Sequence, residues 1–112
     1  MTVKSNEHNS GAFRVGDRLT INDVEQRRNE WLSALPTAKT VTIDAAGTEA
    51  VDVAGLQLLI ALRYSSERAG KAVRLAEPAE GALLQALTQA GFCETQNGAL
   101  PVARDGFWRG EV

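Results

Sequence analysis

Two carboxylates flank the one stretch of this sequence whose residue types suggest chemistry. Asp44 follows the apolar residues Val41 and Ile43, and Asp52 comes directly before a Leu-rich segment. A pair of carboxylates can share the roles of general acid and general base. A structural role explains both more simply, because Asp44 ends a predicted strand and Asp52 suits a helix N-cap, where its side chain accepts hydrogen bonds from free amides. We therefore assign them no acid–base site.

The residues that other common site chemistries need are missing or far apart. Gly47 and Gly55 lack the Lys-Ser/Thr pair of a phosphate-binding loop. The only His, His8, and the only Cys, Cys93, stand near opposite ends of the chain, which is not metal-ligand spacing. No His or basic cluster accompanies Cys93 to stabilise a thiolate, so we expect a small buried hydrophobic residue. The sequence predicts a protein that is not an enzyme and that needs no metal or cofactor.

The size and charge of the chain exclude several classes of protein. Its 112 residues, 44% of them hydrophobic, suit one globular domain. A net charge of −2 with scattered Lys and Arg argues against a nucleic-acid partner. No apolar run approaches the roughly 20 residues of a membrane span, and the N-terminus lacks the apolar core of a signal peptide. The single cysteine suits a reducing compartment, so we expect a cytoplasmic protein that does not insert directly into a membrane.

Hydrophobic periodicity divides the chain into a polar tail and one domain. Residues 1–11 are rich in Asn, Ser and charge and are predicted to be a disordered tail, so that the domain comprises residues 12–112. Period-2 alternation and helical spacing predict strands at 13–15, 19–21, 40–44 and 72–76, and helices that begin after Asn22, at Val53 and at Pro78.

Local signals add detail to these elements. The first two strands form either a hairpin or one bent strand at Gly16-Asp17. Asn22 and Glu25 resemble a capping box for the first helix, whose apolar stripe is expected to include Val24, Trp31, Leu32 and Leu35. Pro36 should end that helix near Ala34, and Gly70 should end the second near Ala69.

The order of these elements predicts the fold class. Strand 41–44, helix 53–69 and strand 72–76 form a βαβ unit with a parallel strand pair. Strands buried on both faces would be continuously apolar, whereas these alternate. We therefore expect an α/β, two-layer domain in which helices pack mainly on one face of a small mixed β-sheet. In the last segment, 94–112, we expect loop with at most one short strand near 100–103, and Phe107 and Trp108 belong either to the core or to an exposed apolar end.

Residues 45–56, which join the strand to the second helix, are the candidate functional region, and we call them the corner. The carboxyl ends of strands in α/β sheets, next to helix N-termini, are the usual site of function. Amides of a helix N-terminus can also receive a phosphate. The residues alone leave two readings open: a binding or switching role for the corner, or a simple helix start.

The corner resembles the STAS domain, which occurs in anti-sigma factor antagonists and in sulfate transporters. The run Val41-Thr-Ile-Asp-Ala-Ala-Gly-Thr-Glu-Ala-Val-Asp-Val-Ala-Gly-Leu56 and the Leu-rich helix after it carry the resemblance. It extends over about residues 13–92 and includes the Arg18-Leu-Thr-Ile strand and the Leu83-Leu84…Gly91-Phe92 helix end. The resemblance implies a STAS-like fold and a regulatory domain that docks onto another protein.

One position departs from the pattern of the antagonists. In that family the residue after this Asp is a Ser or Thr that a partner kinase phosphorylates, and the phosphate disrupts partner binding. Here that position is Val53, which has no oxygen to phosphorylate. Thr48 on the same loop is a weak alternative acceptor, as are Ser65 and Ser66 on the helix. By resemblance, the residues expected to bind the partner are Thr48, Asp52, Val53, Ala54, Gly55 and Leu56.

The resemblance leaves the partner and the pathway open. An antagonist-like protein would bind a kinase-like anti-sigma factor. The Asp52-Val-Ala-Gly55 sequence is also similar to the Asp-Thr-Ala-Gly motif of small STAS subunits that accompany lipid-transport ABC ATPases. Similar short STAS proteins accompany bacterial chemotaxis gene sets. Nucleotide binding, which has been associated with some STAS domains, ranks lower because no Lys or Arg lies between Val41 and Leu62. The oligomeric state stays open as well.

Overall fold

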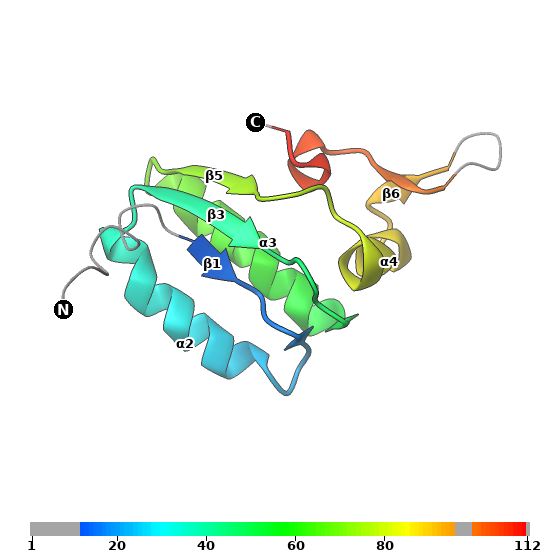
Figure 1. Ribbon diagram of the computed structural model, residues 1–112. Helices are drawn as coiled ribbons and strands as arrows, with labels where there is room; N and C mark the ends of the chain where they lie inside the picture. Colours follow the sequence, from blue (N-terminus) through cyan, green and yellow to red (C-terminus); the bar gives the residue numbers. More distant parts are fainter. Residues whose placement is uncertain (1–11, 96–99, 112) are drawn as a thin grey trace.

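A three-stranded parallel sheet lies at the centre of the molecule (Figure 1). The computed structural model describes residues 12–95 and 100–111, so the tail predicted at 1–11 lies outside the described residues. The sheet has the strand order β1-β3-β5, with β1 at Ala12–Arg14, β3 at Thr40–Asp44 and β5 at Ala72–Leu75. Both strand pairs are parallel, as the βαβ prediction requires for β3 and β5.

Alternation along β3 creates one apolar face on this sheet. Val41 and Ile43 have 0% exposure, whereas Thr40, the first residue of β3, is exposed. The register places Ile43 opposite Phe13 of β1 and Leu75 of β5, and both of these side chains are also buried. A continuous apolar row therefore crosses all three strands.

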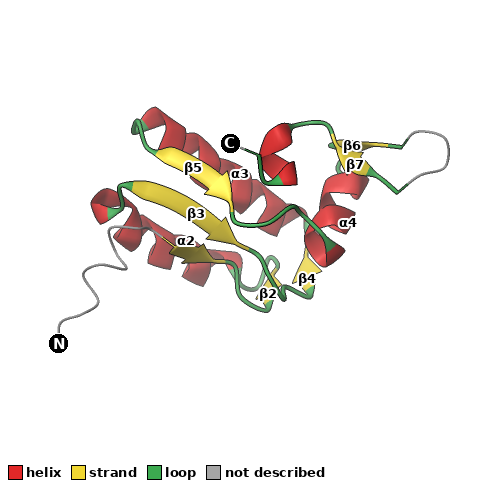
Figure 2. Ribbon diagram, turned by 45° about the horizontal axis from the view of Figure 1, so that its top comes forward, coloured by secondary structure: helices red, strands yellow, loops and turns green. Residues whose placement is uncertain are grey.

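Two helices cover that face and complete the core. Figures 1 and 2 show α2 (Val24–Ala34) and α3 (Val53–Arg68) on the same side of the sheet. Trp31 of α2 and Leu59 of α3 are buried, and the Trp31 ring meets the Phe13 ring edge-on at 6.4 Å and 71°. The prediction of an α/β fold with helices mainly on one face is confirmed, but the central sheet is parallel and not mixed.

The helix ends follow the local signals in the sequence. α2 ends at Ala34 and passes into the 3-10 turn η1 (Leu35–Thr37), which contains Pro36. α3 ends at Arg68, and Gly70 just beyond it has a φ of 76°. Proline lacks the amide that would continue a helix, and glycine adopts the left-handed region at little cost, so both endings were predictable.

The hairpin alternative for the first two strands is wrong. β2 (Arg18–Leu19) pairs in parallel with β4 (Ala50–Val51), in a separate two-stranded sheet, while β1 pairs with β3. Gly16 has a φ of 88°, and a Cβ there would lie 2.9 Å from a guanidinium nitrogen of Arg27. The chain therefore bends at Gly16 and continues from one sheet into the next instead of turning back.

The capping box predicted for α2 is also wrong. The N-cap is Asp23, and its side chain makes no capping bond to the helix. Instead one carboxylate oxygen of Asp23 accepts hydrogen bonds from the Thr20 amide at 3.0 Å and the Thr20 hydroxyl at 2.8 Å. These bonds close the turn before the helix. The Asp23 carboxylate therefore bonds to this turn instead of capping the helix. As a result, Ile21 lies in an exposed turn and not on the inner side of a strand.

The third helix begins later than Pro78. α4 spans Gly81–Gln89, after an extended N-cap at Glu80. The Ala79 amide donates to the Trp108 carbonyl at 2.8 Å, so the segment just before the helix is tied to the C-terminal part of the chain.

The C-terminal segment folds back onto the body of the protein. Strands β6 (Cys93–Glu94) and β7 (Val102–Ala103) form an antiparallel pair, followed by the 3-10 turn η2 (Gly106–Arg109). Within η2, Phe107 is 6% exposed and Trp108 is 3% exposed. These two aromatic residues belong to the core, which resolves the alternatives left by the sequence.

Removal of the Trp108 side chain should destabilise the whole domain. Because Trp108 is buried, we expect Trp108→Ala to lower the free energy of unfolding by about 3–5 kcal/mol. Tyr64, which is 65% exposed on α3, is the control. Tyr64→Ala should change the free energy of unfolding by no more than about 0.5 kcal/mol. Urea denaturation followed by circular dichroism measures both. Equal effects of the two substitutions would contradict the assignment of Trp108 to the core.

Candidate functional site

The carboxylate of Asp52 organises the corner. Asp52 is the N-cap of α3, and its Oδ1 atom accepts the Gly55 amide at 2.9 Å. Its Oδ2 atom accepts the Ile21 amide at 2.8 Å, from the turn that precedes α2. The Gly55 amide, with a further contribution from that of Ile21, holds the pKa of the Asp52 carboxyl below its usual range, although partial burial opposes the shift. One side chain therefore fixes the starts of two helices relative to each other.

Gly55 brings the first turn of α3 into contact with strand β2. A Cβ atom at this position would lie 1.9 Å from the carbonyl oxygen of Leu19, far inside van der Waals contact. The Asp52 amide donates to the same Leu19 oxygen at 3.4 Å. The helix can approach the backbone this closely only because residue 55 has no side chain.

Val53 lies on the outer side of this rigid helix start. It is the first residue of α3, and its side chain is 67% exposed. Ile21, held nearby through the Asp52 bridge, is 65% exposed. An open hollow of about 460 Å³ lies beside Ile21, and its lining also includes Ala54 and Gln57 of α3. The corner thus presents apolar side chains to solvent on a fixed backbone.

The other predicted site residues have different environments. The Thr48 hydroxyl is half-buried and donates to the Gly16 carbonyl at 2.6 Å, which ties the loop to the bend between β1 and β2. Gly55 and Leu56 are buried, and Leu56 is part of the core. The structure therefore brings Asp52, Val53 and Ala54 together at the surface, whereas Leu56 supports them from inside.

The alternative acceptors on α3 differ in access. Ser66 has 0% exposure and its hydroxyl donates to the Leu62 carbonyl at 2.7 Å, while Ser65 is exposed. Asp44 is engaged locally: its Oδ1 atom accepts the Ala46 amide at 3.0 Å, and its Oδ2 atom lies 3.8 Å from Arg14 Nε. The carboxylates of Asp44 and Asp52 thus both accept hydrogen bonds from backbone amides, in agreement with a structural role for each.

Sequence reasoning missed the contribution of the turn before α2. Ile21 was expected to face inward on a strand, and Arg28 and Leu58, which also line the hollow, were not considered as site residues. The Thr20-x-x-Asp23 spacing was the available signal, because it is typical of a side-chain-closed turn that would interrupt a strand. Contact between this turn and Asp52 is a tertiary feature with no local signature.

The described residues contain neither a cluster of metal-binding side chains nor a helix that could cross a membrane. Within residues 12–95 and 100–111, no three His, Cys, Asp or Glu side chains gather as a metal site requires. In the same part of the chain, no helix combines the length and the apolar character needed to cross a bilayer.

Comparison with known proteins identifies the family. A family model described as "Mlab, STAS domain" matches residues 3–99, which is most of the chain. The chain belongs to the STAS domain family. No curated protein and no solved structure gives a significant match. As a STAS domain it is a regulatory domain of the protein-interaction type.

Loss of the Asp52 carboxylate should destabilise the corner in a pH-dependent way. We expect Asp52→Ala to lower the free energy of unfolding by about 1–2 kcal/mol at neutral pH, because two backbone amides lose their acceptor. The folded-state pKa is depressed, so this stabilisation exists above the unfolded-state pKa and is lost as pH falls through the folded-state value. The difference between parent and variant should therefore shrink below about pH 4.

Urea denaturation at neutral pH and at about pH 3 measures this difference. Asp17→Ala, at an exposed aspartate in the bend before β2, is the control and should have little effect at either pH. A loss for Asp52→Ala that is the same size at both pH values would mean that the charge of Asp52 is not what stabilises the corner.

Proposed function

We propose that this protein is a non-enzymatic STAS domain that docks constitutively onto a partner protein through the corner. The observation that carries the proposal is Val53, an apolar residue that is 67% exposed at the first position of α3. In antagonist-like STAS domains this position holds the Ser or Thr whose phosphorylation ends partner binding. Valine has nearly the shape of threonine, so the surface keeps the form of the unphosphorylated state.

The chemistry around Val53 supports docking over catalysis. Ile21, whose amide donates to Asp52, and Val53, which follows Asp52 in the chain, are both exposed apolar residues. Apolar anchors on a pre-ordered backbone favour protein binding, because little conformational entropy is lost on association. No Lys or Arg lies between Val41 and Leu62, so the corner itself offers no cationic side chain to a phosphate.

The motif is compatible with three classes of partner. An anti-sigma factor of the kinase-like type fits the antagonist resemblance. An ABC ATPase of a lipid-transport system is the second candidate, favoured by the likeness of Asp52-Val-Ala-Gly55 to the Asp-Thr-Ala-Gly of such STAS subunits. A chemotaxis-associated role is a third alternative of the same docking type. In each case we place the protein in the cytoplasm of a bacterial cell, where a chain with one cysteine needs no disulfide.

Nucleotide binding is a weaker candidate for the corner. At the start of α3 the Gly55 amide already donates to Asp52, and the negative charge of Asp52 would repel a phosphate. A thermal shift with GTP or ATP tests this candidate directly, since a ligand stabilises the folded state by RT ln(1 + [L]/Kd). A shift of several degrees at millimolar nucleotide would favour it over protein docking.

A charge at position 53 should abolish docking without unfolding the protein. Val53→Glu imitates the phosphorylated state, and a Glu in the first turn of an exposed helix is compatible with the helix dipole. In pull-downs from the source cell, the partner captured by the parent should be lost with Val53→Glu. Val102→Glu, at a 49% exposed valine on β7, is the matched control and should retain it.

The second variant, Val53→Thr, should bind the partner as the parent does and should gain a phosphate when the partner is a kinase. Mass spectrometry identifies the captured protein, so an anti-sigma factor and an ABC ATPase give different results. Intact mass before and after kinase treatment shows whether position 53, or Thr48 in the parent, is modified. Unchanged capture by Val53→Glu would remove the corner from the interface and end the proposal.

A further inference from the structure

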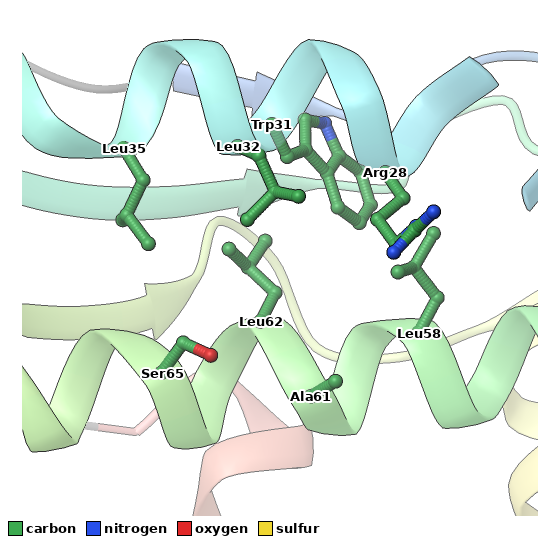
Figure 3. Close-up of a pocket in the computed structure, with 8 residues that line it drawn as sticks. All are labelled: Arg28, Trp31, Leu32, Leu35, Leu58, Ala61, Leu62 and Ser65. Carbon is green, nitrogen blue, oxygen red and sulfur yellow. The ribbon is translucent and has the colours of Figure 1, made fainter. Parts of the chain in front are cut away.

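An apolar groove runs between α2 and α3 on the outer side of the helical layer. Figure 3 shows Leu32 and Leu35 on one wall pointing toward Leu62 on the other, with Leu58 and Ala61 further along α3. Leu32 was expected in the buried stripe of α2, yet it is 55% exposed. The groove therefore leaves apolar side chains accessible that the fold itself does not cover.

The groove is continuous with the corner. Arg28 and Leu58 line both the groove and the hollow that contains Ile21 and Ala54. A molecule bound at the corner can thus continue along the two helices, past Arg28 and into the more apolar groove. From Ala54 to Ser65, the α3 wall is about 17 Å long at 1.5 Å per residue, which corresponds to three helical turns.

The walls of the groove select the backbone conformation of an occupant. Both walls are α-helices, whose backbone amides and carbonyls are already paired within each helix. An extended segment would find no backbone partners there, and its own amides would lose water without replacement. An α-helix satisfies its own backbone and needs only apolar side chains to fill the groove, as in helix-in-groove recognition.

Arg28 adds a charge requirement. It is exposed where the groove and the hollow meet, and Figure 3 shows its guanidinium beside Leu58. Within the described residues, no hydrogen bond or ion pair involves Arg28, whereas its neighbour Arg27 is paired with Glu30 at 2.7 Å. A free guanidinium at the rim of an apolar groove is complementary to a carboxylate on the occupant.

We propose that the groove between α2 and α3 receives an amphipathic α-helix of about three turns from the partner protein, with an acidic residue opposite Arg28. This inference rests on the proposed function, because the helix would extend the contact made at the corner. It adds the secondary structure, the length and the charge pattern of the binding segment.

A phage-displayed library of amphipathic helices with randomised exposed positions is the probe. Selection on the full-length protein should enrich clones with apolar residues at helical spacing and an Asp or Glu among them. Binding of the enriched peptide should fall at least about tenfold with Leu32→Asp. Leu100→Asp, at an 83% exposed leucine away from the groove, is the matched control and should bind as the parent does.

Charge exchange tests the role of Arg28. Replacing the acidic residue of the enriched peptide by Lys should weaken binding roughly three- to tenfold, because an attractive exposed pair becomes repulsive. With Arg28→Glu, the Lys peptide should bind more tightly than the acidic peptide. Circular dichroism and thermal unfolding confirm that every variant is folded. The inference would be overturned if Leu32→Asp left the affinity of the enriched peptides unchanged. It would also be overturned if the Arg28→Glu variant still bound the acidic peptide more tightly than the Lys peptide.

Two further outcomes separate the possible failures. If sedimentation shows a dimer that Leu32→Asp dissociates, the occupant is a second copy of this chain, and the partner-helix inference is wrong. If Val53→Glu releases the partner and Leu32→Asp does not, docking at the corner stands and only the groove is refuted. If Val53→Glu retains the partner, the proposed function fails, whatever the peptides show.

Discussion

The bridge made by the Asp52 carboxylate is the interaction on which the rest of the site depends. Its two oxygens accept amides from α3 and from the turn before α2, which are 34 residues apart in sequence at Gly55 and Ile21. The bridge adds to the contact of the α3 start with the Leu19 backbone. Together these contacts hold the exposed apolar side chains at the corner in place, and a binding surface gains affinity from such pre-organisation.

Gly55 is the steric counterpart of this electrostatic bridge. Its missing side chain lets the first turn of α3 rest on the backbone of Leu19, so that the helix starts where the parallel strands β2 and β4 end. The Asp-x-x-Gly spacing of the family therefore has two physical functions in this chain. The carboxylate caps and cross-links, and the glycine permits close packing.

Val53 is the first residue of α3, at the position where antagonist-like STAS domains carry the Ser or Thr that is phosphorylated. The surrounding structure needs no hydroxyl there, because the side chain points to solvent and the N-cap bonds are made by Asp52. A valine can therefore replace the acceptor without cost to the fold. Under the proposed function, a neutral apolar residue at this position keeps the surface in one chemical state.

The sequence by itself determined the central βαβ unit and the capped start of α3. These features are encoded locally, in the alternation of Val41 and Ile43, in the helical spacing after Val53 and in the short-range capping by Asp52. Periodicity and capping depend on neighbours within a few residues, so a single sequence is enough to reveal them.

Tertiary structure alone decided which other residues join the site. The Asp52 carboxylate ties the Ile21 amide to the start of α3, the Trp108 carbonyl accepts the Ala79 amide ahead of α4, and Leu32 is exposed on the wall of the groove. Each of these outcomes depends on groups that lie far apart in the chain. No local pattern encodes such contacts, because they are set by how the finished elements pack against one another.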